Sequence, residues 1–395
     1  MKKKKILFVI DSLACAGAEK SLVTLLSLLD YSKYEVDLQL FAYGGEFEQF
    51  LPSQVKLLSP FKYTDFLHKS LTNQVLSLDL QKFFARITYS LAIRKSGLLH
   101  TDKAVIYWKS VSRCIEPNSK YYDVAIGYGQ GVPTFYVADK VSAGKKFAWI
   151  NAVYKIHDSR KKFIFDIYKK IDKIVSVSLA AQKVFVEIFP QFADKMHIIQ
   201  DPINADFINM MALKKGDLQI KKDKPVLLTV ARLDNGHKGY DIALEAAKIL
   251  QDRGISFRWY AIGRGDFRPQ MEKFIAQNQM EDVFVLLGPM SNPYPYFKQA
   301  KIYVQTSRHE GFGLSIAEAR ILNVPVVTTE FDAVYNQMIP EKNGLVVPQS
   351  PECVANAIER LLEDQSLYKN IVSFQKQEKK GNPEEVEKFY HLIEG

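Results

Sequence analysis

Residues Ile302–Arg320 read IYVQTSRHEGFGLSIAEAR, and this short pattern is the most informative in the chain. Ile302–Gln305 is a short apolar run typical of a buried strand, and Ser315–Leu322 has the apolar spacing of a helix. The loop between them carries a glutamate followed by the tripeptide Gly-Phe-Gly. A strand, a glycine-containing loop and a helix in this order form a βα unit, the building block of parallel sheets.

The same alternation of strand and helix runs through the rest of the chain, which predicts an α/β protein with parallel sheets covered on both faces. The polar stretch Asp201–Lys224 lacks a clear period, and we expect it to connect two domains. The expected strands are Lys5–Asp11, Val36–Ala42, Asp123–Gly127, Lys146–Ile150, Lys173–Val177, Ile198–Ile199, Pro225–Val230, Phe257–Ile262, Val283–Leu287, Ile302–Gln305 and Val324–Val327. The expected helices are Gly17–Leu29, Tyr240–Arg253, Ser315–Leu322, Pro351–Leu362 and Pro383–Ile393.

Length and composition exclude several classes of protein. The 395 residues suggest two or three domains, and 47% apolar with 25% charged residues is ordinary for a folded protein. Collagen-like, disordered and disulfide-framework classes are excluded. Lys2–Lys5 precede an apolar run, Ile6–Ile10, that is too short for a signal peptide. Three scattered cysteines fit a reducing compartment without structural zinc, so we expect a cytoplasmic protein.

The net charge of +9 is unevenly distributed. Residues 1–200 hold 29 basic and 18 acidic side chains, whereas residues 201–395 hold 24 and 26. Three interpretations remain: a merely soluble surface, a surface that faces anionic lipid headgroups or an anionic acceptor, and a nucleic-acid-binding surface. We expect no nucleic-acid partner, because the basic residues are scattered and no nucleic-acid-binding motif accompanies them.

Residues 61–113 are expected to be mostly helical, with cations among apolar positions. This region either covers the sheet or lies on an anionic membrane surface, and the sequence favours neither. Its cations are Lys62, Lys69, Lys82, Arg86, Arg94 and Lys95, and its apolar positions include Phe83, Phe84, Ile87 and Leu91.

The first glycine loop lies in Asp11–Glu19, DSLACAGAE, between the first strand and its helix. Gly17 would allow a close approach of backbone to a ligand, and a helix that opens there favours an anion. A plain strand-to-helix turn explains the pattern equally well. The fingerprint G-x-G-x-x-G is absent, which argues against NAD or FAD.

A second loop lies in Val230–Glu245, VARLDNGHKGYDIALE. Arg232 follows a strand end, and Lys238 precedes a glycine and a helix. Two cations at these places would suit one anion, and a diphosphate fits a planar guanidinium and a point charge. The alternative is an exposed loop with ordinary surface charges.

The loop quoted first offers both amides and carboxylates. The amides of Leu314 and Ser315 at the helix start suit a phosphate. Glu318, expected on the first turn, accepts hydrogen bonds only and so suits a pair of sugar hydroxyls. Acidic residues near a helix start are also favoured by the helix dipole alone. The Gly-Phe-Gly insertion after Glu310 argues against that simpler explanation.

Together these motifs resemble the signature of the family-4 retaining glycosyltransferases (glycosyl transferases group 1), which have the GT-B fold. Glu310-x7-Glu318 with Arg232 and Lys238 carries the resemblance, and it extends over nearly the whole chain. Further pieces that resemble the family are Ala16–Glu19, Ile174–Ser178, Lys195–Asn204, Ala261–Gly265, Leu286–Gly288 and Gly344–Pro348.

The resemblance implies two Rossmann-like domains that face each other across a cleft. Residues 1–203 would form the acceptor-side domain and residues 204–381 the nucleotide-sugar-binding domain. A C-terminal helix within 382–395 would pack back onto the first domain. Ligands of such sheets bind beyond the carboxyl ends of the strands, where every motif above is expected.

The resemblance also implies a role for each matched residue. Arg232 and Lys238 would bind the donor diphosphate and neutralise the leaving group, and Glu318 would hold the nucleotide ribose. Glu310 would grip the transferred sugar, together with the amides of Gly311, Phe312 and Gly313. Gly17 would bring backbone to the phosphates or the acceptor, and Gly263 lies in a loop on the nucleotide side.

Two positions depart from the family pattern. Asn151 stands where the family often has a histidine near the reacting sugar, and an amide takes no proton at neutral pH. Asn336 or Gln337 stands where the family has a late glutamate. His309 lies beside Glu310 and either touches the sugar side of the site or makes an ordinary loop hydrogen bond.

The predicted function is retaining transfer of a hexose or N-acetylhexosamine from a nucleotide diphosphate sugar, with a UDP-sugar as the preferred donor. The acceptor would be a glycan or a lipid-linked acceptor in bacterial surface polysaccharide or glycoconjugate synthesis. We expect no cofactor, and no D-x-D triplet signals a metal. The alternative is a non-catalytic GT-B subunit or chaperone that binds a partner glycosyltransferase.

Overall fold

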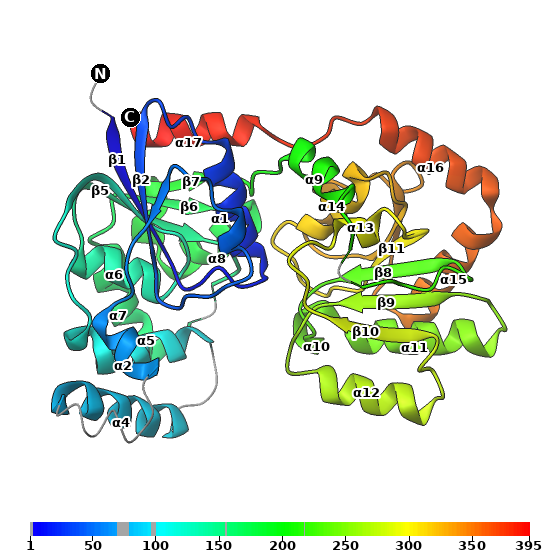
Figure 1. Ribbon diagram of the computed structural model, residues 1–395, viewed down its shortest axis with the longest axis horizontal. Helices are drawn as coiled ribbons and strands as arrows, with labels where there is room; N and C mark the ends of the chain where they lie inside the picture. Colours follow the sequence, from blue (N-terminus) through cyan, green and yellow to red (C-terminus); the bar gives the residue numbers. More distant parts are fainter. Residues whose placement is uncertain (1–2, 69–78, 96–99, 155, 217) are drawn as a thin grey trace. The chain divides into compact units, whose positions relative to one another are not determined.

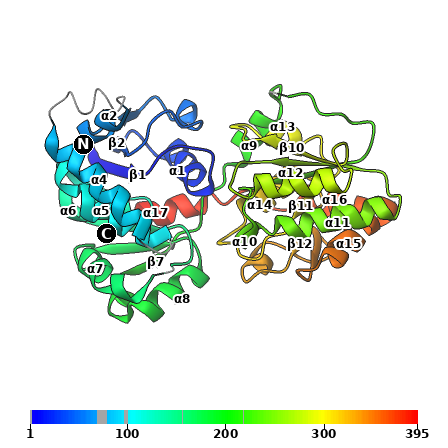
Figure 2. The same ribbon diagram turned by 90° about the horizontal axis from the view of Figure 1, so that it is seen from below.

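The computed structural model describes residues 3–68, 79–95, 100–154, 156–216 and 218–395. It divides the chain into two compact units. Unit 1 consists of Met1–Asp201 and Glu384–Gly395, and unit 2 of Pro202–Pro383. Figures 1 and 2 show each unit as a sheet flanked by helices. Lys69, one of the cations of the 61–113 region, lies outside the described residues.

Unit 1 is built on seven parallel strands in the order β3-β2-β1-β4-β5-β6-β7. The apolar residues of β1 alternate between two cores. Leu7 and Val9 join one core, and Ile6 and Phe8 join the other on the opposite face. A strand that is buried on both faces in this way reads as a continuous apolar run. The strands are β1 (Lys4–Ile10), β2 (Tyr34–Leu40), β3 (Val55–Leu57), β4 (Tyr121–Gly127), β5 (Ser142–Ile150), β6 (Lys173–Ser176) and β7 (Met196–Ile198).

Helices cover both faces of this sheet, and the last helix of the chain is one of them. In α17, Phe389 stacks on Phe8 with ring centroids 6.0 Å apart, and its ring lies 6.2 Å from that of Trp149. The C-terminal helix therefore belongs to the core of unit 1. The helices are α1 (Gly17–Leu28), α2 (Lys62–His68), α4 (Leu80–Lys95), α5 (His100–Val111), α6 (Val132–Lys140), α7 (Asp158–Tyr168), α8 (Leu179–Ile188) and α17 (Glu384–Glu394).

Unit 2 is built on six parallel strands in the order β10-β9-β8-β11-β12-β13. Helices α11, α12 and α15 share one core against the sheet. The strands are β8 (Val226–Val230), β9 (Arg258–Ile262), β10 (Phe284–Gly288), β11 (Ile302–Gln305), β12 (Val326–Thr329) and β13 (Gly344–Val347). The helices are α9 (Ala205–Ala212), α10 (Asn235–Lys238), α11 (Tyr240–Asp252), α12 (Arg268–Gln277), α13 (Tyr294–Phe297), α14 (Leu314–Ile321), α15 (Pro351–Glu363) and α16 (Gln365–Gln377).

The predicted α/β class with two parallel sheets is confirmed, with one correction to its organisation. The stretch Asp201–Lys224 is not a featureless connection, because it contains α9. Asn204 caps this helix by accepting a hydrogen bond from the Phe207 backbone N–H at 3.0 Å. Ile208 and Met211 are buried, and the helix packs against α13 and α14. Six of the eight residues of α9 are apolar, but the helix is short and the residues after it are mainly polar, so the stretch as a whole shows no clear period.

None of the described helices is both long enough and apolar enough to span a membrane.

Candidate donor site

The candidate site lies at the carboxyl ends of β8 and β11. These strands are neighbours in the centre of the unit 2 sheet, and the chain builds outward from them in opposite directions. Such a topological switch point is where open parallel sheets bind ligands, because the loops on either side diverge. The loops after both strands therefore meet at one edge, which brings the second and third motifs together.

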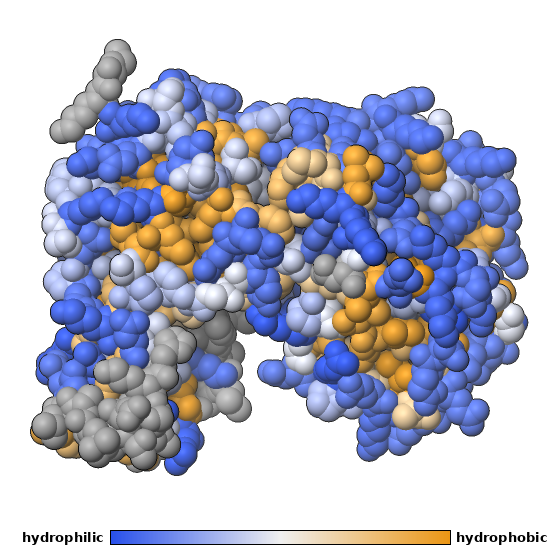
Figure 3. Space-filling model, in the orientation of Figure 1, coloured by the Kyte–Doolittle hydropathy of each residue, from blue (hydrophilic) through white to orange (hydrophobic). Residues whose placement is uncertain are grey.

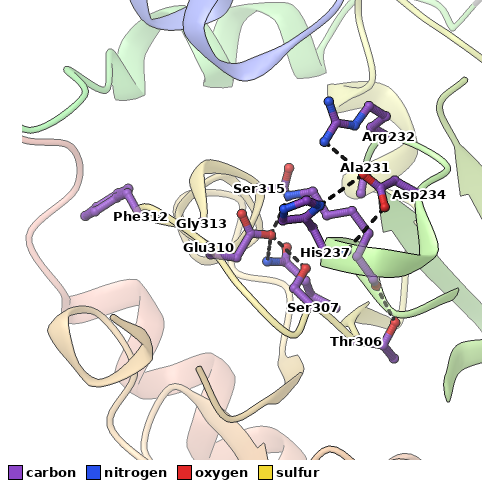
Figure 4. Close-up of polar contacts among 12 residues, drawn as sticks. Ala231, Arg232, Asp234, His237, Thr306, Ser307, Glu310, Phe312, Gly313 and Ser315 are labelled. Atoms are coloured by element: carbon purple, nitrogen blue, oxygen red, sulfur yellow. Dashed lines mark hydrogen bonds and ion pairs between the residues drawn. The ribbon is translucent and has the colours of Figure 1, made fainter. Parts of the chain in front are cut away.

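The central contact of the site is an ion pair between these two loops (Figure 4). The Lys238 ammonium donates to Oε1 of Glu310 at 2.6 Å, and the two side chains are 21% and 11% exposed. Gln305 Nε2 and Ser307 Oγ donate to the same carboxylate oxygen at 2.8 and 2.7 Å. Three donors on one oxygen fix the orientation of Glu310, so the loop presents a carboxylate in a defined position.

Arg232 precedes α10, the short helix that ends at Lys238, and its side chain is 63% exposed and pairs with a different carboxylate. Its guanidinium donates to Asp234 at 2.9 Å. The Asp234 carboxylate also caps α10 by accepting from the His237 backbone N–H at 3.2 Å. Burial opposes ionisation of this carboxyl, but the N–H donor and the Arg232 charge prevail and lower the pKa of Asp234. The two cations predicted to bind the diphosphate thus have different partners: Arg232 pairs with Asp234, and Lys238 pairs with Glu310.

The two loops are locked together by close backbone contacts. Gly239 has a φ of 60°, and a Cβ there would stand 2.2 Å from the Thr306 carbonyl oxygen. Thr306 Oγ1 donates to the Lys238 carbonyl at 3.0 Å, and Arg308 makes two hydrogen bonds to Asp241 at 2.8 and 2.6 Å. Sequence reasoning missed these supporting residues, although a glycine directly after a short helical turn was a usable signal.

The N-terminus of α14 supplies the amides that the sequence predicted. Gly313 takes a φ of 85° immediately before this helix. Ser315 Oγ donates to the Val230 carbonyl at 2.9 Å, which joins the helix start to the end of β8. The backbone N–H groups of Leu314 and Ser315 lie in the first turn, where helix geometry provides no acceptor. The helix start can therefore bind an anion. The Phe312 ring points away from the Glu310 carboxylate (Figure 4).

Glu318 lies on the second turn of α14, not on the first as predicted, because the helix begins at Leu314. Glu318 is 2% exposed, and the Tyr294 hydroxyl donates to its Oε1 at 3.3 Å. Burial and the neighbouring carboxylate raise the pKa of Tyr294 well above its usual range, so this phenol stays a donor. The structure therefore buries the Glu318 side chain of α14 against Tyr294 of α13.

Gly263 and Gln337, in neighbouring loops, support the backbone of the site. A Cβ on Gly263 would stand 1.9 Å from the Ala231 carbonyl oxygen, so close packing against the Arg232 loop requires glycine there. Gln337, buried at 8% exposure, donates from its amide to the carbonyls of Phe312 and Gly313. It thereby holds the Gly-Phe-Gly loop, whereas Asn336 is exposed.

The remaining predicted residues are His309 in unit 2 and Gly17 and Asn151 in unit 1. His309 is exposed, with its ring 6.3 Å from that of His237. Gly17 and Asn151 belong to unit 1: Gly17 is the first residue of α1, and Asn151 follows β5. The Asn151 backbone N–H donates to Gln130 at 2.9 Å, and its side-chain amide donates to the Tyr128 carbonyl at 3.4 Å. Asn151 is thus held at the carboxyl edge of the unit 1 sheet.

Comparison with solved structures defines the class of the fold. The chain resembles HepE from Anabaena in complex with UDP and glucose over 99% of both chains, with a TM-score of 0.68 and 16% identity. It resembles TarM from S. aureus over 99% of this chain and 100% of that one, with a TM-score of 0.68 and 14% identity. The architecture of two parallel α/β units is therefore the GT-B fold, as predicted.

Sequence comparison identifies the domain that carries the site. Residues 211–378 match the family model of the glycosyl transferases group 1, and this range lies within unit 2. An α-D-kanosaminyltransferase from Streptomyces kanamyceticus is 32% identical over 153 residues, which is 38% of this chain and 39% of that protein. The amylovoran biosynthesis glycosyltransferase AmsK from Erwinia amylovora is 30% identical over 131 residues, or 31% and 32% of the two chains.

A longer match is the N-acetylgalactosaminyltransferase from Campylobacter jejuni that acts on N-acetylgalactosamine-N,N'-diacetylbacillosaminyl-diphospho-undecaprenol. It is 27% identical over 215 residues, which is 53% of this chain and 57% of that protein. These three alignments span between about a third and three fifths of the relatives' length. The narrower assignment to family 4 stays a prediction.

Proposed function

We propose that this protein is a retaining glycosyltransferase that moves a hexose or N-acetylhexosamine from a UDP-sugar to a glycan or lipid-linked acceptor. The observation that carries the proposal is the Lys238–Glu310 ion pair at the switch point of a group 1 domain. It joins a cation suited to a diphosphate with a carboxylate suited to sugar hydroxyls, next to the free amides of a helix start.

The chemistry follows from where charge develops. Cleavage of the sugar–phosphate bond leaves negative charge on the diphosphate. Lys238, Arg232 and the amides of Leu314 and Ser315 would stabilise that charge without a metal ion, because fixed cations and dipoles need no reorganisation during the reaction. Glu310 would accept hydrogen bonds from the transferred sugar and orient its anomeric carbon. Glu318 would hold the ribose only if donor binding exposes its carboxylate.

In this proposal the acceptor hydroxyl attacks from the face that the diphosphate leaves, so that the configuration of the anomeric carbon is retained. No protein nucleophile is then needed. Loss of the hydroxyl proton to the departing phosphate balances the step. The names of the relatives support an acceptor in polysaccharide or glycoconjugate synthesis, and the scattered cysteines support a cytoplasmic reaction.

A direct test offers the purified chain a panel of UDP-hexoses and UDP-N-acetylhexosamines and measures released UDP. The proposal expects release from at least one UDP-sugar, faster in the presence of a glycan acceptor, and an α-linked product by NMR when the donor is α-linked. A product of inverted configuration would contradict the retaining mechanism. Release at equal rates from Lys238→Met and wild type would contradict the proposed site.

A further inference from the structure

Helix α4 of unit 1 exposes a continuous row of large apolar side chains. Leu80, Phe84, Ile87 and Leu91 are 64%, 61%, 39% and 52% exposed. Their spacing of four, three and four residues places them on one face of the helix. They are four of the thirteen large apolar side chains that are exposed among the described residues, so exposure is concentrated here. Single exposed apolar residues are common on proteins, whereas a row of four needs an explanation.

The opposite face of α4 packs against the rest of unit 1. Ala85 is buried at 7% exposure, and the Tyr89 ring meets that of Tyr107 on α5 edge-on at 5.4 Å. The Lys82 ammonium pairs with Asp79 at 2.7 Å and lies 6.0 Å from the centre of the Phe66 ring. These contacts fix the rotation of the helix, and the apolar row is therefore turned outward.

The placement of α4 agrees with this orientation. The two views of the chain show α4 as the outermost helix on its side of unit 1, beyond α5 (Figures 1 and 2). On the face seen in Figure 3, hydrophilic residues surround several apolar areas on both units. The exposed fractions of the four side chains, not this view, therefore define the row on α4.

Charge identifies the partner. The sequence of α4, LQKFFARITYSLAIRK, contains four cations and no carboxylate, and residues 1–200 carry 29 basic against 18 acidic side chains. Arg94 is exposed near the end of the row. A helix with an apolar row and only positive charge is typical of elements that lie in the interface of an anionic bilayer, where phosphates attract the cations.

We propose that the outer face of α4, formed by Leu80, Phe84, Ile87 and Leu91, inserts into the headgroup region of an anionic lipid bilayer. This contact would hold unit 1 at a membrane surface, where a lipid-linked acceptor is found. It extends the acceptor side of the proposed function, but it depends only on the surface of unit 1. Membrane binding and sugar transfer can therefore fail separately.

The test is cosedimentation of the full chain with vesicles of phosphatidylcholine alone and of phosphatidylcholine with phosphatidylglycerol. At low salt we expect binding to the anionic vesicles and about tenfold weaker binding at 0.5 M NaCl, because salt screens the cations. Phe84→Ser combined with Leu91→Ser should reduce anionic-vesicle binding about tenfold or more, since two exposed apolar side chains that would enter the bilayer are lost. Wild-type protein that remains in the supernatant with anionic vesicles would overturn the proposal.

A matched control keeps the test specific. Leu179→Ser combined with Leu213→Ser removes two side chains that are 71% and 74% exposed but lie on α8 and after α9. This control should bind vesicles like the wild type. Equal vesicle binding by the α4 variant and the wild type would overturn the assignment to α4. Self-association of the wild type through these four residues that persists when vesicles are added would also overturn it. UDP release to a soluble acceptor, unchanged in the α4 variant, separates this result from a failure of the transferase activity.

Discussion

Single side chains set the electrostatics of the candidate site, and Lys238 is central among them. It is the cation that links the β8 loop to the β11 loop through Glu310. In the free protein its charge is balanced by that carboxylate. During sugar transfer it would also meet the charge that develops on the diphosphate. We therefore expect the more buried Lys238 to influence the proposed reaction more than the exposed Arg232.

Replacement of Lys238 tests this role. Lys238→Met should lower kcat/KM for the UDP-sugar about 100-fold or more, because loss of a preorganised charge-stabilising group costs about 10²–10³ in rate. Steady-state UDP release measures the effect. Lys248→Met is the matched control, since Lys248 pairs with Asp252 at the surface of the same unit. Similar losses in both variants would contradict a specific role of Lys238.

Gln337 controls the shape of the Gly-Phe-Gly loop. Its amide donates to the carbonyls of Phe312 and Gly313, and no carboxylate could do so. Gln337→Leu leaves these carbonyls without that donor and should lower the free energy of unfolding by about 1–3 kcal/mol, as measured by urea denaturation. The exposed Gln349, which also donates to two backbone carbonyls, is the control. Gln349→Leu should cost less than about 0.5 kcal/mol.

Elements place these side chains, and here most of the fold could be predicted. The strands that are buried on both faces gave continuous apolar runs, and the glycine loops after them marked the carboxyl edge. The edge strand β3 has three residues with Lys56 exposed, and α16 buries only Ile371 and Gln375. β3 is too short to show a period. The apolar residues Leu367, Ile371 and Phe374 of α16 do have helical spacing, but the sequence analysis did not use this pattern.

The candidate site could be predicted only in part, because its contacts join residues that are far apart in the sequence. Sequence placed Lys238 and Glu310 at the ends of two strands, but their contact spans 72 positions and depends on the order of strands in the sheet. The support from Gln305, Ser307 and Gln337 depends on side-chain directions that no local pattern encodes. The turn of α14 that carries Glu318 was misplaced because the helix begins one residue earlier than its apolar spacing suggests.

The contact between the β8 and β11 loops is testable through one glycine. A left-handed backbone conformation costs an alanine about 1–2 kcal/mol. Gly239→Ala should lower the free energy of unfolding by more than this, because its Cβ would also overlap the Thr306 carbonyl. Gly254→Ala is the control, since Gly254 has a φ of 74° with open space around its Cβ position. Urea denaturation compares the two, and equal losses would show that the loops do not meet as described.

For the molecule as a whole, the chain passes from unit 1 to unit 2 directly after Asp201. Ser21 Oγ donates to the Asp201 carboxylate at 2.5 Å and also meets the buried Tyr128 hydroxyl at 2.7 Å. Burial raises the pKa of Asp201 to about 6. Asp201 therefore binds a proton more tightly in the folded than in the unfolded protein.

This difference predicts the pH dependence of stability. A raised carboxyl pKa contributes stability that is present below pH 3.8 and is lost as the pH rises through about 6. Asp201→Asn keeps an acceptor for Ser21 and should remove up to about 3 kcal/mol of this pH-dependent loss. The variant should therefore unfold at a higher temperature than the wild type at pH 8 and at a similar temperature at pH 4. A constant difference at both pH values would contradict the assignment.

We propose above that the β8–β11 edge of unit 2 binds the diphosphate of a nucleotide sugar donor. Calorimetric titration of the purified chain with UDP, without and with magnesium, tests it most directly. We expect one UDP to bind per chain without magnesium. Lys238→Met should weaken this binding at least about tenfold, because it removes one charge-assisted contact worth about 1.5–3 kcal/mol. Absence of UDP binding, or equal affinity in the wild type and Lys238→Met, would contradict it.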